Sequence, residues 1–210
     1  MQKMQQIFDY LDTLYPNPVC ALEFETPYQL LVAVVLSAQC TDKRVNQVSK
    51  QLFKVAPTPE KMLSLGEEKL KQIIYPCGFY NNKSKAIISL TKDLLERFDG
   101  VVPNNMQDLT SLKGVGRKTA NVVMGVAFKE QTIAVDTHVH RISKRLGLTS
   151  QNSTPLQCET DLCKLTPIDR RTKLHHQLIW FGREHCKAIN PDCENCKLKN
   201  IGKKENYEHR

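Results

Sequence analysis

The sequence lacks a long apolar segment. In this chain of 210 residues, the longest apolar run is Leu30–Leu36, far short of the roughly 18 residues that a membrane-spanning helix needs. The first residues, Met-Gln-Lys-Met-Gln-Gln, lack the apolar core of a secretory signal. Apolar residues make up 40% of the chain, which is too many for an intrinsically disordered protein. We therefore expect a globular, cytosolic protein that has no membrane partner.

Segments with the composition of a β-strand are also scarce. Only Thr132–Val135 has strand-like character, and it is too short to found a sheet. Elsewhere apolar residues recur at helical spacing, as at Met4, Ile7, Leu11 and Leu14. The sequence therefore predicts an all-α fold.

Threonine and proline mark several of the expected helix starts. Thr26–Gln29 (Thr-Pro-Tyr-Gln) has the form of a capping box with proline at the first helical position. Thr58–Pro59 opens another helix in the same way. The run from Leu30 to Ala38 is apolar on all sides, which predicts that the helix containing it is buried centrally.

Negative charge is less abundant than positive charge, and the excess is local. Lysine and arginine number 30 against 22 aspartate and glutamate residues, which gives a net charge of +8. Residues 113–145 carry a net +5 of this, from Lys113, Arg117, Lys118, Lys129, Arg141, Lys144 and Arg145 against Glu130 and Asp136. Such a segment favours a polyanionic partner, nucleic acid first. A solvated basic face is an equally simple interpretation.

A Gly-x-Gly turn lies between two expected helices. One helix ends near Leu112, the turn is Gly114–Gly116, and the next helix runs from about Arg117 to Phe128. The second helix has one apolar stripe, formed by Ala120, Val123, Met124, Ala127 and Phe128. Lys118 lies roughly opposite this stripe, so we expect it to project away from the core.

The backbone of this turn suits a phosphate group. Glycines tolerate a tight turn and allow another backbone to approach closely, and amides at a helix N-terminus bind phosphate oxygens. Residues 106–128 therefore have the pattern of a helix-hairpin-helix motif, which grips a nucleic-acid backbone without reading its sequence. A bare Gly-x-Gly turn also occurs in helix connections that have no such role.

A carboxylate follows shortly after the hairpin. Asp136 ends the apolar run at Val135 and precedes a helix with Val139 and Ile142 on one face. Taken singly, Asp136 or Thr137 is a helix N-cap and Lys118 is an ordinary exposed lysine.

Taken together, these segments are similar to the active-site region of the endonuclease III family of DNA glycosylases and abasic-site lyases. The similar segments are Leu112–Val123 (Leu-Lys-Gly-Val-Gly-Arg-Lys-Thr-Ala-Asn-Val-Val), Ile133–Val139 (Ile-Ala-Val-Asp-Thr-His-Val), Leu36–Asp42 (Leu-Ser-Ala-Gln-Cys-Thr-Asp), Gly78–Asn81 (Gly-Phe-Tyr-Asn) and the C-terminal cysteines. The resemblance extends over nearly the whole chain. It implies a bacterial, cytosolic and monomeric enzyme that acts on double-stranded DNA with damaged bases or abasic sites.

The resemblance also implies the chemistry and the residues that perform it. The enzyme would remove oxidised pyrimidines and cleave the abasic strand by β-elimination, with Lys118 as nucleophile and Asp136 as catalytic carboxylate. The residue types fit, because a neutral amine that attacks C1′ forms a Schiff base. The imine acidifies the neighbouring C2′ hydrogen, so that the 3′ phosphate can leave. A hydroxyl nucleophile has no such electron sink.

Further residues would contact DNA by the same resemblance: Gly114, Val115, Gly116 and Arg117 at the hairpin, and Gln39 and Phe79 within the duplex. A base inside a duplex must be flipped out before an enzyme can act on it, and the inserted side chains fill the gap. The family often has leucine where this chain has Phe79. The alternative interpretation is that Gln39 caps a helix end and Phe79 is a core residue.

The resemblance implies two helical lobes that flank a DNA-binding cleft. Residues 21–131 would form the central lobe with the helix-hairpin-helix motif. Residues 1–20 and 132–210 would form the second lobe, with a cysteine loop at residues 186–202.

The eight cysteines fall into two groups. In a reducing cytosol we expect thiols or metal ligands instead of disulfides, and core thiols at Cys20, Cys40, Cys77, Cys158 and Cys163. The spacing Cys-x6-Cys-x2-Cys of Cys186, Cys193 and Cys196 matches three ligands of the family's 4Fe-4S cluster. The family's fourth cysteine is replaced by Gly202, and a closed 4Fe-4S site normally has four thiolates.

Several outcomes for these three thiols stay open. Another group, such as Cys163, Glu205 or His209, could complete the cluster site. A cluster with one open iron could form and be labile, or the cluster could be absent. Zinc held by three cysteines and one histidine is also chemically allowed.

Two other functions compete with the bifunctional enzyme. A monofunctional glycosylase, such as the adenine-mismatch enzyme, is disfavoured by Lys118 and by the absence of an additional C-terminal domain. A helix-hairpin-helix DNA-binding protein without catalysis is disfavoured because Lys118 and Asp136 both occur in matching contexts.

Overall fold

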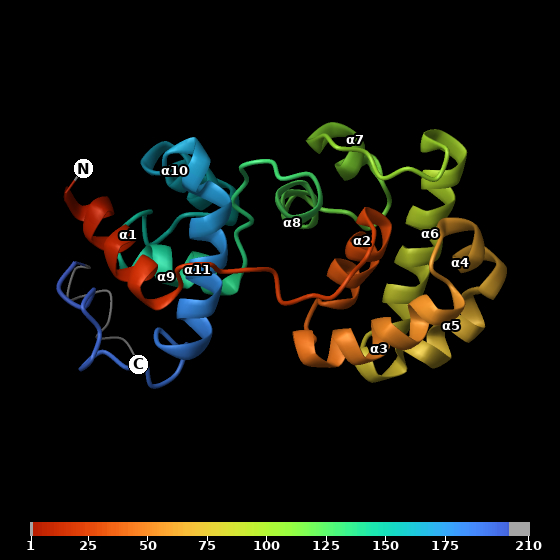
Figure 1. The fold of residues 1–210 in the computed structure, drawn as a ribbon, viewed down its shortest axis with the longest axis horizontal. Helices are drawn as coiled ribbons and strands as arrows, with labels where there is room; N and C mark the ends of the chain where they lie inside the picture. Colours follow the sequence, from red (N-terminus) through yellow and green to blue (C-terminus); the bar gives the residue numbers. More distant parts are fainter. Residues whose placement is uncertain (1, 202–210) are drawn as a thin grey trace. The chain divides into compact units, whose positions relative to one another are not determined.

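A computed structural model describes residues 2–201, and all regular secondary structure in this range is helical (Figure 1). Eleven α-helices and two 3-10 helices occur there, and these described residues contain no strand. Residues 132–135 are irregular, and Ile133–Val135 are buried. The predicted all-α fold is therefore confirmed. No helix in residues 2–201 combines the length and the apolar character of a membrane span.

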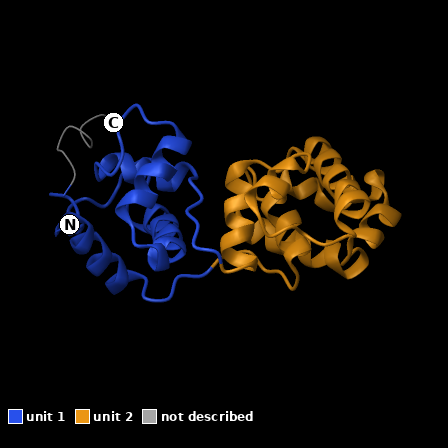
Figure 2. Ribbon diagram, turned by 90° about the horizontal axis from the view of Figure 1, so that it is seen from above, with its two compact units in different colours: residues 1–19, 130–210 blue, residues 20–129 orange. Residues whose placement is uncertain are grey.

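The chain divides into two compact units (Figure 2). Unit 1 contains the described residues 2–19 and 130–201, and unit 2 contains residues 20–129. The N-terminal helix thus belongs to the same unit as the C-terminal part of the chain. Each unit has a hydrophobic core of its own.

The centre of unit 2 is helix α2 (Pro27–Leu36), which is apolar on all sides and buried from Tyr28 to Leu36. It packs against α3 (Asp42–Val55), α6 (Tyr80–Phe98) and α8 (Arg117–Ala127). The central burial predicted from the apolar run is confirmed, because a helix without a polar face must be covered all round. The other elements of unit 2 are α4 (Pro59–Leu65), α5 (Glu67–Ile74), the 3-10 helix η1 (Tyr75–Cys77) and α7 (Met106–Ser111).

The start of α2 follows the prediction only in part. The Thr26 side chain accepts a hydrogen bond from the backbone N–H of Gln29, and Pro27 occupies the first turn. The Gln29 side-chain oxygen does not return to the Thr26 backbone as a capping box requires. It accepts from the backbone N–H of Glu25 at 2.9 Å. A complete capping box forms instead at Thr154, where the Gln157 side chain accepts from the Thr154 N–H.

Unit 1 is built around α11 (Arg171–Glu184). This helix packs against α9 (Thr137–Arg145) and α1 (Gln2–Leu14), and α9 contacts α10 (Pro155–Leu165). Gly182 allows α9 and α11 to approach closely, because a Cβ at that position would lie 2.9 Å from side-chain atoms of His138 and Ile142. The short 3-10 helix η2 (Ile168–Arg170) leads into α11.

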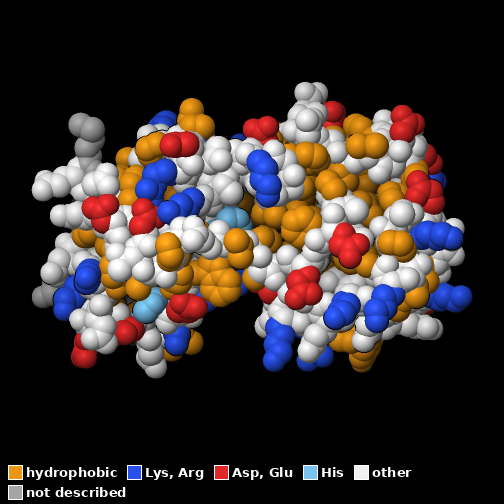
Figure 3. Space-filling model, in the orientation of Figure 1, with side chains coloured by type: hydrophobic (Ala, Val, Ile, Leu, Met, Phe, Trp, Pro, Cys, Tyr) orange, Lys and Arg blue, Asp and Glu red, His pale blue; other side chains and the backbone are white. Residues whose placement is uncertain are grey.

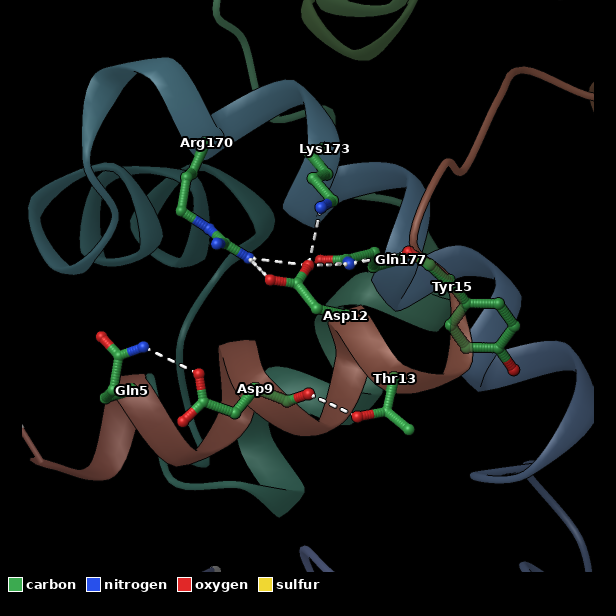
Figure 4. A network of polar contacts seen from close by, with 8 residues as sticks. All are labelled: Gln5, Asp9, Asp12, Thr13, Tyr15, Arg170, Lys173 and Gln177. Atoms are coloured by element: carbon green, nitrogen blue, oxygen red, sulfur yellow. Dashed lines mark hydrogen bonds and ion pairs between the residues drawn. The ribbon is translucent and has the colours of Figure 1, made fainter.

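A polar network joins α1 to η2 and α11 through Asp12 (Figure 4). Arg170 Nη2 donates to both carboxylate oxygens at 3.0 Å, and Lys173 Nζ and Gln177 Nε2 each approach Oδ1 at 2.8 Å. Burial by itself would raise the pKa of Asp12, but the hydrogen bonds from Lys173, Gln177 and Arg170 outweigh it and lower the pKa to about 2. Asp12 is therefore charged at neutral pH, and its contacts connect the N-terminal helix α1 to η2 and α11.

Candidate active site and nucleic-acid interface

The turn between α7 and α8 depends on its first glycine. Gly114 has φ of +83°, and a Cβ there would lie 3.0 Å from the Cβ of Ala86. A left-handed backbone and a close neighbour both exclude larger residues. Val115 is buried and its N–H donates to the carbonyl of Leu112 at 3.1 Å, which anchors the turn against the core of unit 2.

The second glycine has a different environment. Gly116 is the N-cap of α8 with φ of −90°, and a Cβ built there meets no atom within 4 Å. No side chain of the described residues makes a capping hydrogen bond at this helix start. The space next to Gly116 is therefore open at the positive end of the helix dipole, an arrangement that suits an anion.

Lys118 lies on the first turn of α8 and is exposed, as its position opposite the apolar stripe predicts. On the other side of the helix, Ala120 and Val123 are fully buried. Arg117, which precedes Lys118, is exposed as well. The fold of unit 2 thus leaves Lys118 exposed to solvent directly after the hairpin turn.

Asp136 belongs to unit 1 and is half-buried. It is the N-cap of α9, and its Oδ1 accepts a hydrogen bond from the backbone N–H of Val139 at 2.8 Å. The N-cap expected at Asp136 or Thr137 is therefore Asp136 itself. The cap fixes the orientation of the carboxylate, which is compatible with a catalytic role as well as a structural one.

Gln39 and Phe79 both occupy exposed turns of unit 2 in the left-handed backbone region. Gln39 has φ of +53° and Phe79 has φ of +48°. Ser37 is the C-cap of α2, so the interpretation of Gln39 as a helix cap is wrong. The Phe79 side chain is 61% exposed, so the interpretation of Phe79 as a core residue is also wrong. Strained backbone of this kind is frequently found at functional sites.

An open hollow of about 280 Å³ brings several of the predicted residues together within unit 2. Gln39, Phe79 and Gly114 line it, along with Lys83 and Thr119. The two turns expected to enter a duplex therefore border the same hollow as the Gly114–Gly116 turn. Sequence spacing alone cannot show this, because the three turns follow different helices.

Lys83 is a residue of this region that the sequence reasoning missed. It is only 5% exposed, and its Nζ donates to the carbonyl of Cys77 at 2.8 Å. Burial lowers the pKa of Lys83. Its burial could have been predicted from its position in the helical repeat, because Lys83 lies on the same face of α6 as the buried residues Ile87, Leu90 and Leu94.

Part of the basic segment has a structural role in unit 1. Arg141 Nη2 donates to the carbonyls of Gly182 at 3.0 Å and Cys186 at 2.9 Å. Arg145 donates to the carbonyls of Lys187 at 2.6 Å and Ala188 at 3.2 Å. These two arginines of α9 satisfy carbonyls at the end of α11 and in the following loop, where cations are favourable.

Surface charge elsewhere is mixed. On the face shown in Figure 3, basic and acidic side chains are interspersed over both units. The basic residues of the segment 113–145 therefore do not all have the same role. Arg117 and Lys118 are exposed at the hairpin, whereas Arg141 and Arg145 donate to carbonyls in unit 1.

The three C-terminal cysteines all lie in the loop after α11. Burial raises the pKa of the Cys196 thiol, and the nearby thiols of Cys186 and Cys193 raise it further, while backbone hydrogen bonds oppose them. The Cys186 sulfur accepts a hydrogen bond from Arg145 Nη1 at 3.3 Å.

These thiols do not complete a metal site in the part of the chain that the structure describes. Among residues 2–201, no three His, Cys, Asp or Glu side chains are arranged to hold a metal ion. Cys163 lies in α10 and packs against the core of unit 1. Gly202, Glu205 and His209 lie outside the described residues. Among the described residues the loop after α11 provides three thiols, one fewer than a closed 4Fe-4S cluster uses.

The five scattered cysteines are not all core thiols. Cys77 and Cys158 are buried, and Cys40 and Cys163 are half-buried beside the two cores. Cys20 is half-buried and belongs to neither core, so its assignment as a core thiol is wrong.

Comparison with known proteins places this geometry in a family. Residues 32–167 match the HhH-GPD superfamily of base excision DNA repair proteins. Endonuclease III of Bacillus subtilis (strain 168) is 44% identical over 198 residues, which cover 94% of this chain and 90% of the relative. Endonuclease III of Rickettsia conorii is 46% identical over 198 residues, which cover 94% of each chain. The chain belongs to the endonuclease III family.

Solved structures of endonuclease III agree with this assignment. A trapped endonuclease III–DNA covalent intermediate is 43% identical, with a TM-score of 0.92 over 97% of this chain and 96% of that chain. A non-covalent endonuclease III–DNA complex is 42% identical, with a TM-score of 0.93 over 96% and 94%. A thermostable thymine-DNA glycosylase, 21% identical with a TM-score of 0.81, shares the fold.

Proposed function

We propose that this chain is a bifunctional DNA glycosylase that removes oxidised pyrimidines from double-stranded DNA and then cleaves the abasic strand. The observation that carries the proposal is the exposed Lys118 directly after the Gly114–Gly116 turn, in a member of the endonuclease III family. A relative with 43% identity has been trapped as a covalent intermediate with DNA. The chain acts as a monomer on DNA in the bacterial cytosol, and its curated relatives are bacterial endonuclease III enzymes.

Lys118 is the nucleophile in this proposal. Its amine attacks C1′ of the damaged nucleotide as the bond from C1′ to the base breaks. Loss of a proton and opening of the sugar ring give a Schiff base between Lys118 and C1′. The imine acidifies the C2′ hydrogen, and departure of that proton expels the 3′ phosphate by β-elimination. Hydrolysis of the imine then returns the free lysine.

Asp136 is the catalytic carboxylate. It accepts and returns protons during these steps and stabilises the positive charge that develops at C1′. Its N-cap hydrogen bond to Val139 supports this role, because it holds one carboxylate oxygen in place before the substrate arrives. A carboxylate that is already oriented loses little conformational freedom when the reaction begins.

The hairpin binds the DNA backbone. The N–H groups at the start of α8 bind a phosphate oxygen, with Gly114, Val115 and Gly116 shaping the turn and Arg117 adding positive charge. The open space around Gly116 lets the phosphate approach the backbone closely. This contact contains no base recognition, so it serves lesions in any sequence context.

Gln39 and Phe79 enter the duplex when the damaged nucleotide is flipped out. Both are exposed at turns that border one hollow in unit 2, which supports a shared role. An exposed phenylalanine can stack between bases as a wedge where the family often has leucine.

The cysteine loop takes no part in this chemistry. Its described residues provide three thiols, which do not fit a closed four-thiolate cluster. The steps at C1′ and C2′ need only an amine and a carboxylate, so they do not depend on what Cys186, Cys193 and Cys196 hold.

The test uses an oligonucleotide duplex with a single abasic site. We expect the wild-type chain to cut the strand without alkali, and borohydride to trap a covalent protein–DNA adduct. Lys118→Gln should lose strand cutting by on the order of a thousandfold and give no adduct, while it still binds the duplex. Retained cutting by Lys118→Gln would refute the nucleophile assignment.

A matched control is Lys113→Gln, which removes the same charge from an exposed position before the turn. This variant should still cut the strand at saturating DNA. The same assay separates the competing functions, because a monofunctional glycosylase cuts only after alkali and a non-catalytic binder does not cut at all.

A further inference from the structure

Lys83 is a buried lysine at an unusual position in unit 2. It is the fourth residue of α6, it is only 5% exposed, and it borders the hollow that Gln39 and Phe79 also line. Burial of an ammonium group is costly, and a positive charge in the first turn of a helix opposes the helix dipole. The chemistry proposed at C1′ gives this side chain no role. Residues that are present despite such unfavourable effects often mark functional sites.

The contacts of Lys83 lie on both sides of Gly78. Its Nζ donates to the carbonyl of Cys77 at 2.8 Å, and its backbone N–H donates to the carbonyl of Phe79 at 3.0 Å. Cys77 is itself buried and ends η1, so its carbonyl lies at the entrance to the turn between η1 and α6. Lys83 therefore binds the peptide group that precedes Gly78 and the one that follows Phe79.

This turn has an unfavourable backbone. Gly78 has φ of +67° and Phe79 has φ of +48°, and the left-handed region is unfavourable for a bulky residue that has a Cβ. The Phe79 side chain is 61% exposed, so burial of its ring does not offset the strain. Phe79 is the N-cap of α6, and no side chain of residues 2–201 makes a capping hydrogen bond there. The hydrogen bond from Lys83 Nζ thus stabilises a turn that its own residues disfavour.

We propose that Lys83 is a positioning residue, whose hydrogen bond to the Cys77 carbonyl holds the Gly78–Phe79 turn so that the Phe79 ring is ready to enter the duplex. The inference rests on the function proposed above, because that function makes Phe79 the inserted side chain. Lys83 acts through Phe79 and takes no part in the steps at C1′. A side chain that is held in place before binding loses less conformational freedom when it is inserted.

Removal of the donor should release the turn. Lys83→Met keeps a long apolar stem but leaves the Cys77 carbonyl without this hydrogen bond. The backbone of Phe79 can then relax toward an ordinary conformation, and the ring is no longer held for insertion. Extrusion of the damaged nucleotide should become less favourable, whereas the phosphate contact proposed at the hairpin does not involve Lys83.

The experiment is a double-mutant cycle between Lys83 and Phe79, which measures whether the two residues act through each other. Strand cutting at an abasic site in a duplex is measured under single-turnover conditions for full-length wild type, Lys83→Met, Phe79→Ala and the double variant. Lys85→Met is the matched control, because it removes the same charge from an exposed position on the same helix. Lys83→Arg is the conservative variant, because it keeps a long cationic donor.

Insertion into the duplex is followed separately by fluorescence. A 2-aminopurine base is placed opposite an abasic analogue that cannot be cut, and it becomes brighter when it loses its stacking neighbours. We expect wild type and Lys85→Met to raise this signal on binding, and Lys83→Met and Phe79→Ala to raise it much less. Affinity for undamaged duplex should be the same in wild type, Lys83→Met and Lys85→Met.

We expect Lys83→Met and Phe79→Ala each to cut more slowly by on the order of tenfold. The double variant should be no slower than Phe79→Ala, and Lys83→Arg should recover most of the rate. Wild-type cutting by Lys83→Met overturns the inference, and so does a double variant whose loss is the product of the two single losses.

Failure of both Lys83→Met and Lys83→Arg to fold, measured by circular dichroism, would make Lys83 a core residue and would also overturn the inference. If wild type does not cut at all, the proposed function fails. The fluorescence signal needs no cutting, so it still decides whether Lys83 acts through Phe79.

Discussion

The hairpin turn at Gly114–Gly116 and the loop after α11 are both short connections at a helix end, but different parts of the chain hold them. The hairpin is fixed locally, by the left-handed backbone of Gly114 and the buried side chain of Val115. The loop is fixed from a distance, by Arg141 and Arg145 of α9, which bind the carbonyls of residues 182–188. A local motif is complete in contiguous residues, whereas a loop held from a distance has no signature in its own sequence.

This difference explains why two parts of one basic segment have different roles. Lys118 and Arg117 are exposed beside the hairpin, where charge can act on a ligand. Arg141 and Arg145 lie in the same stretch of sequence, yet they bind protein carbonyls. Net charge along a sequence therefore overstates the charge that a nucleic acid can contact.

The largest expected change comes from supplying a fourth thiol to the loop. We expect Gly202→Cys to hold a 4Fe-4S cluster that the wild-type chain does not retain, because four thiolates close the site. Iron analysis and an absorption band at about 400 nm measure the difference. Strand cutting at an abasic site should change little in either protein.

Gly202→Ala is the control for this substitution, and it should bind no more iron than the wild type. Stoichiometric iron in the wild-type chain would show instead that another group completes the site. Substitution of Cys163, Glu205 and His209 in turn would then identify the fourth ligand.

Gly114→Val should cause the next largest effect, because it places a β-branched residue at φ of +83° and a Cβ 3.0 Å from that of Ala86. We expect a loss of about 2–3 kcal/mol in the free energy of unfolding and weaker binding to undamaged duplex. Denaturant unfolding and a binding titration at fixed salt measure the two effects.

Gly116→Ala sharpens this prediction. Its backbone is ordinary and its Cβ meets open space, so the free energy of unfolding should stay nearly constant. DNA affinity should still fall, because the added methyl group occupies space proposed for a phosphate. Equal affinity in Gly116→Ala and wild type would argue against phosphate binding at this turn.

Arg145→Met tests how the cysteine loop is held. Removing the guanidinium leaves the carbonyls of Lys187 and Ala188 without this donor, and we expect a loss of about 1–2 kcal/mol. Limited proteolysis should cut residues 185–201 faster than in the wild type, while strand cutting stays unchanged at saturating DNA. Lys144→Met removes the same charge from α9 and serves as control; comparable proteolysis of both variants would contradict the role given to Arg145.

The smallest effect concerns the Asp12 network and depends on pH. The pKa of Asp12 is lowered from its ordinary 3.8 to about 2 in the folded chain. The charged carboxylate therefore stabilises the fold fully at pH values above the pKa of Asp12 in the unfolded chain. This stabilisation is lost as the pH falls through the pKa of Asp12 in the folded chain. Thermal unfolding should show Asp12→Asn less stable than wild type by about 1 kcal/mol at neutral pH, an amount reduced by solvent screening.

The difference between Asp12→Asn and wild type should shrink as pH falls from 4 toward 2, where protonation removes the same charge that the substitution removes. A difference that persists unchanged at the acid end would mean that the charge of Asp12 does not stabilise unit 1.

Much of the fold was predictable because its signals are local. Helix starts at Thr26, Thr41, Thr58 and Thr154 use the side-chain oxygen of the residue as a cap, which needs only the next three residues. The same pattern nevertheless gave different outcomes at two places. Thr-Pro-x-Gln forms a capping box at Thr154 but not at Thr26, because the Gln29 side chain there binds Glu25 instead.

The sequence by itself determined the all-α class, the hairpin with its exposed Lys118, and the family to which the chain belongs. These depend on helical periodicity, glycine conformation and contiguous motifs, which are properties of neighbouring residues. Only the tertiary structure decided that Arg141 and Arg145 bind carbonyls of the cysteine loop, that Phe79 is exposed, and that Gln39, Phe79 and Gly114 border one hollow. These contacts join residues that are distant in the chain, and they arise from packing, which no local pattern encodes.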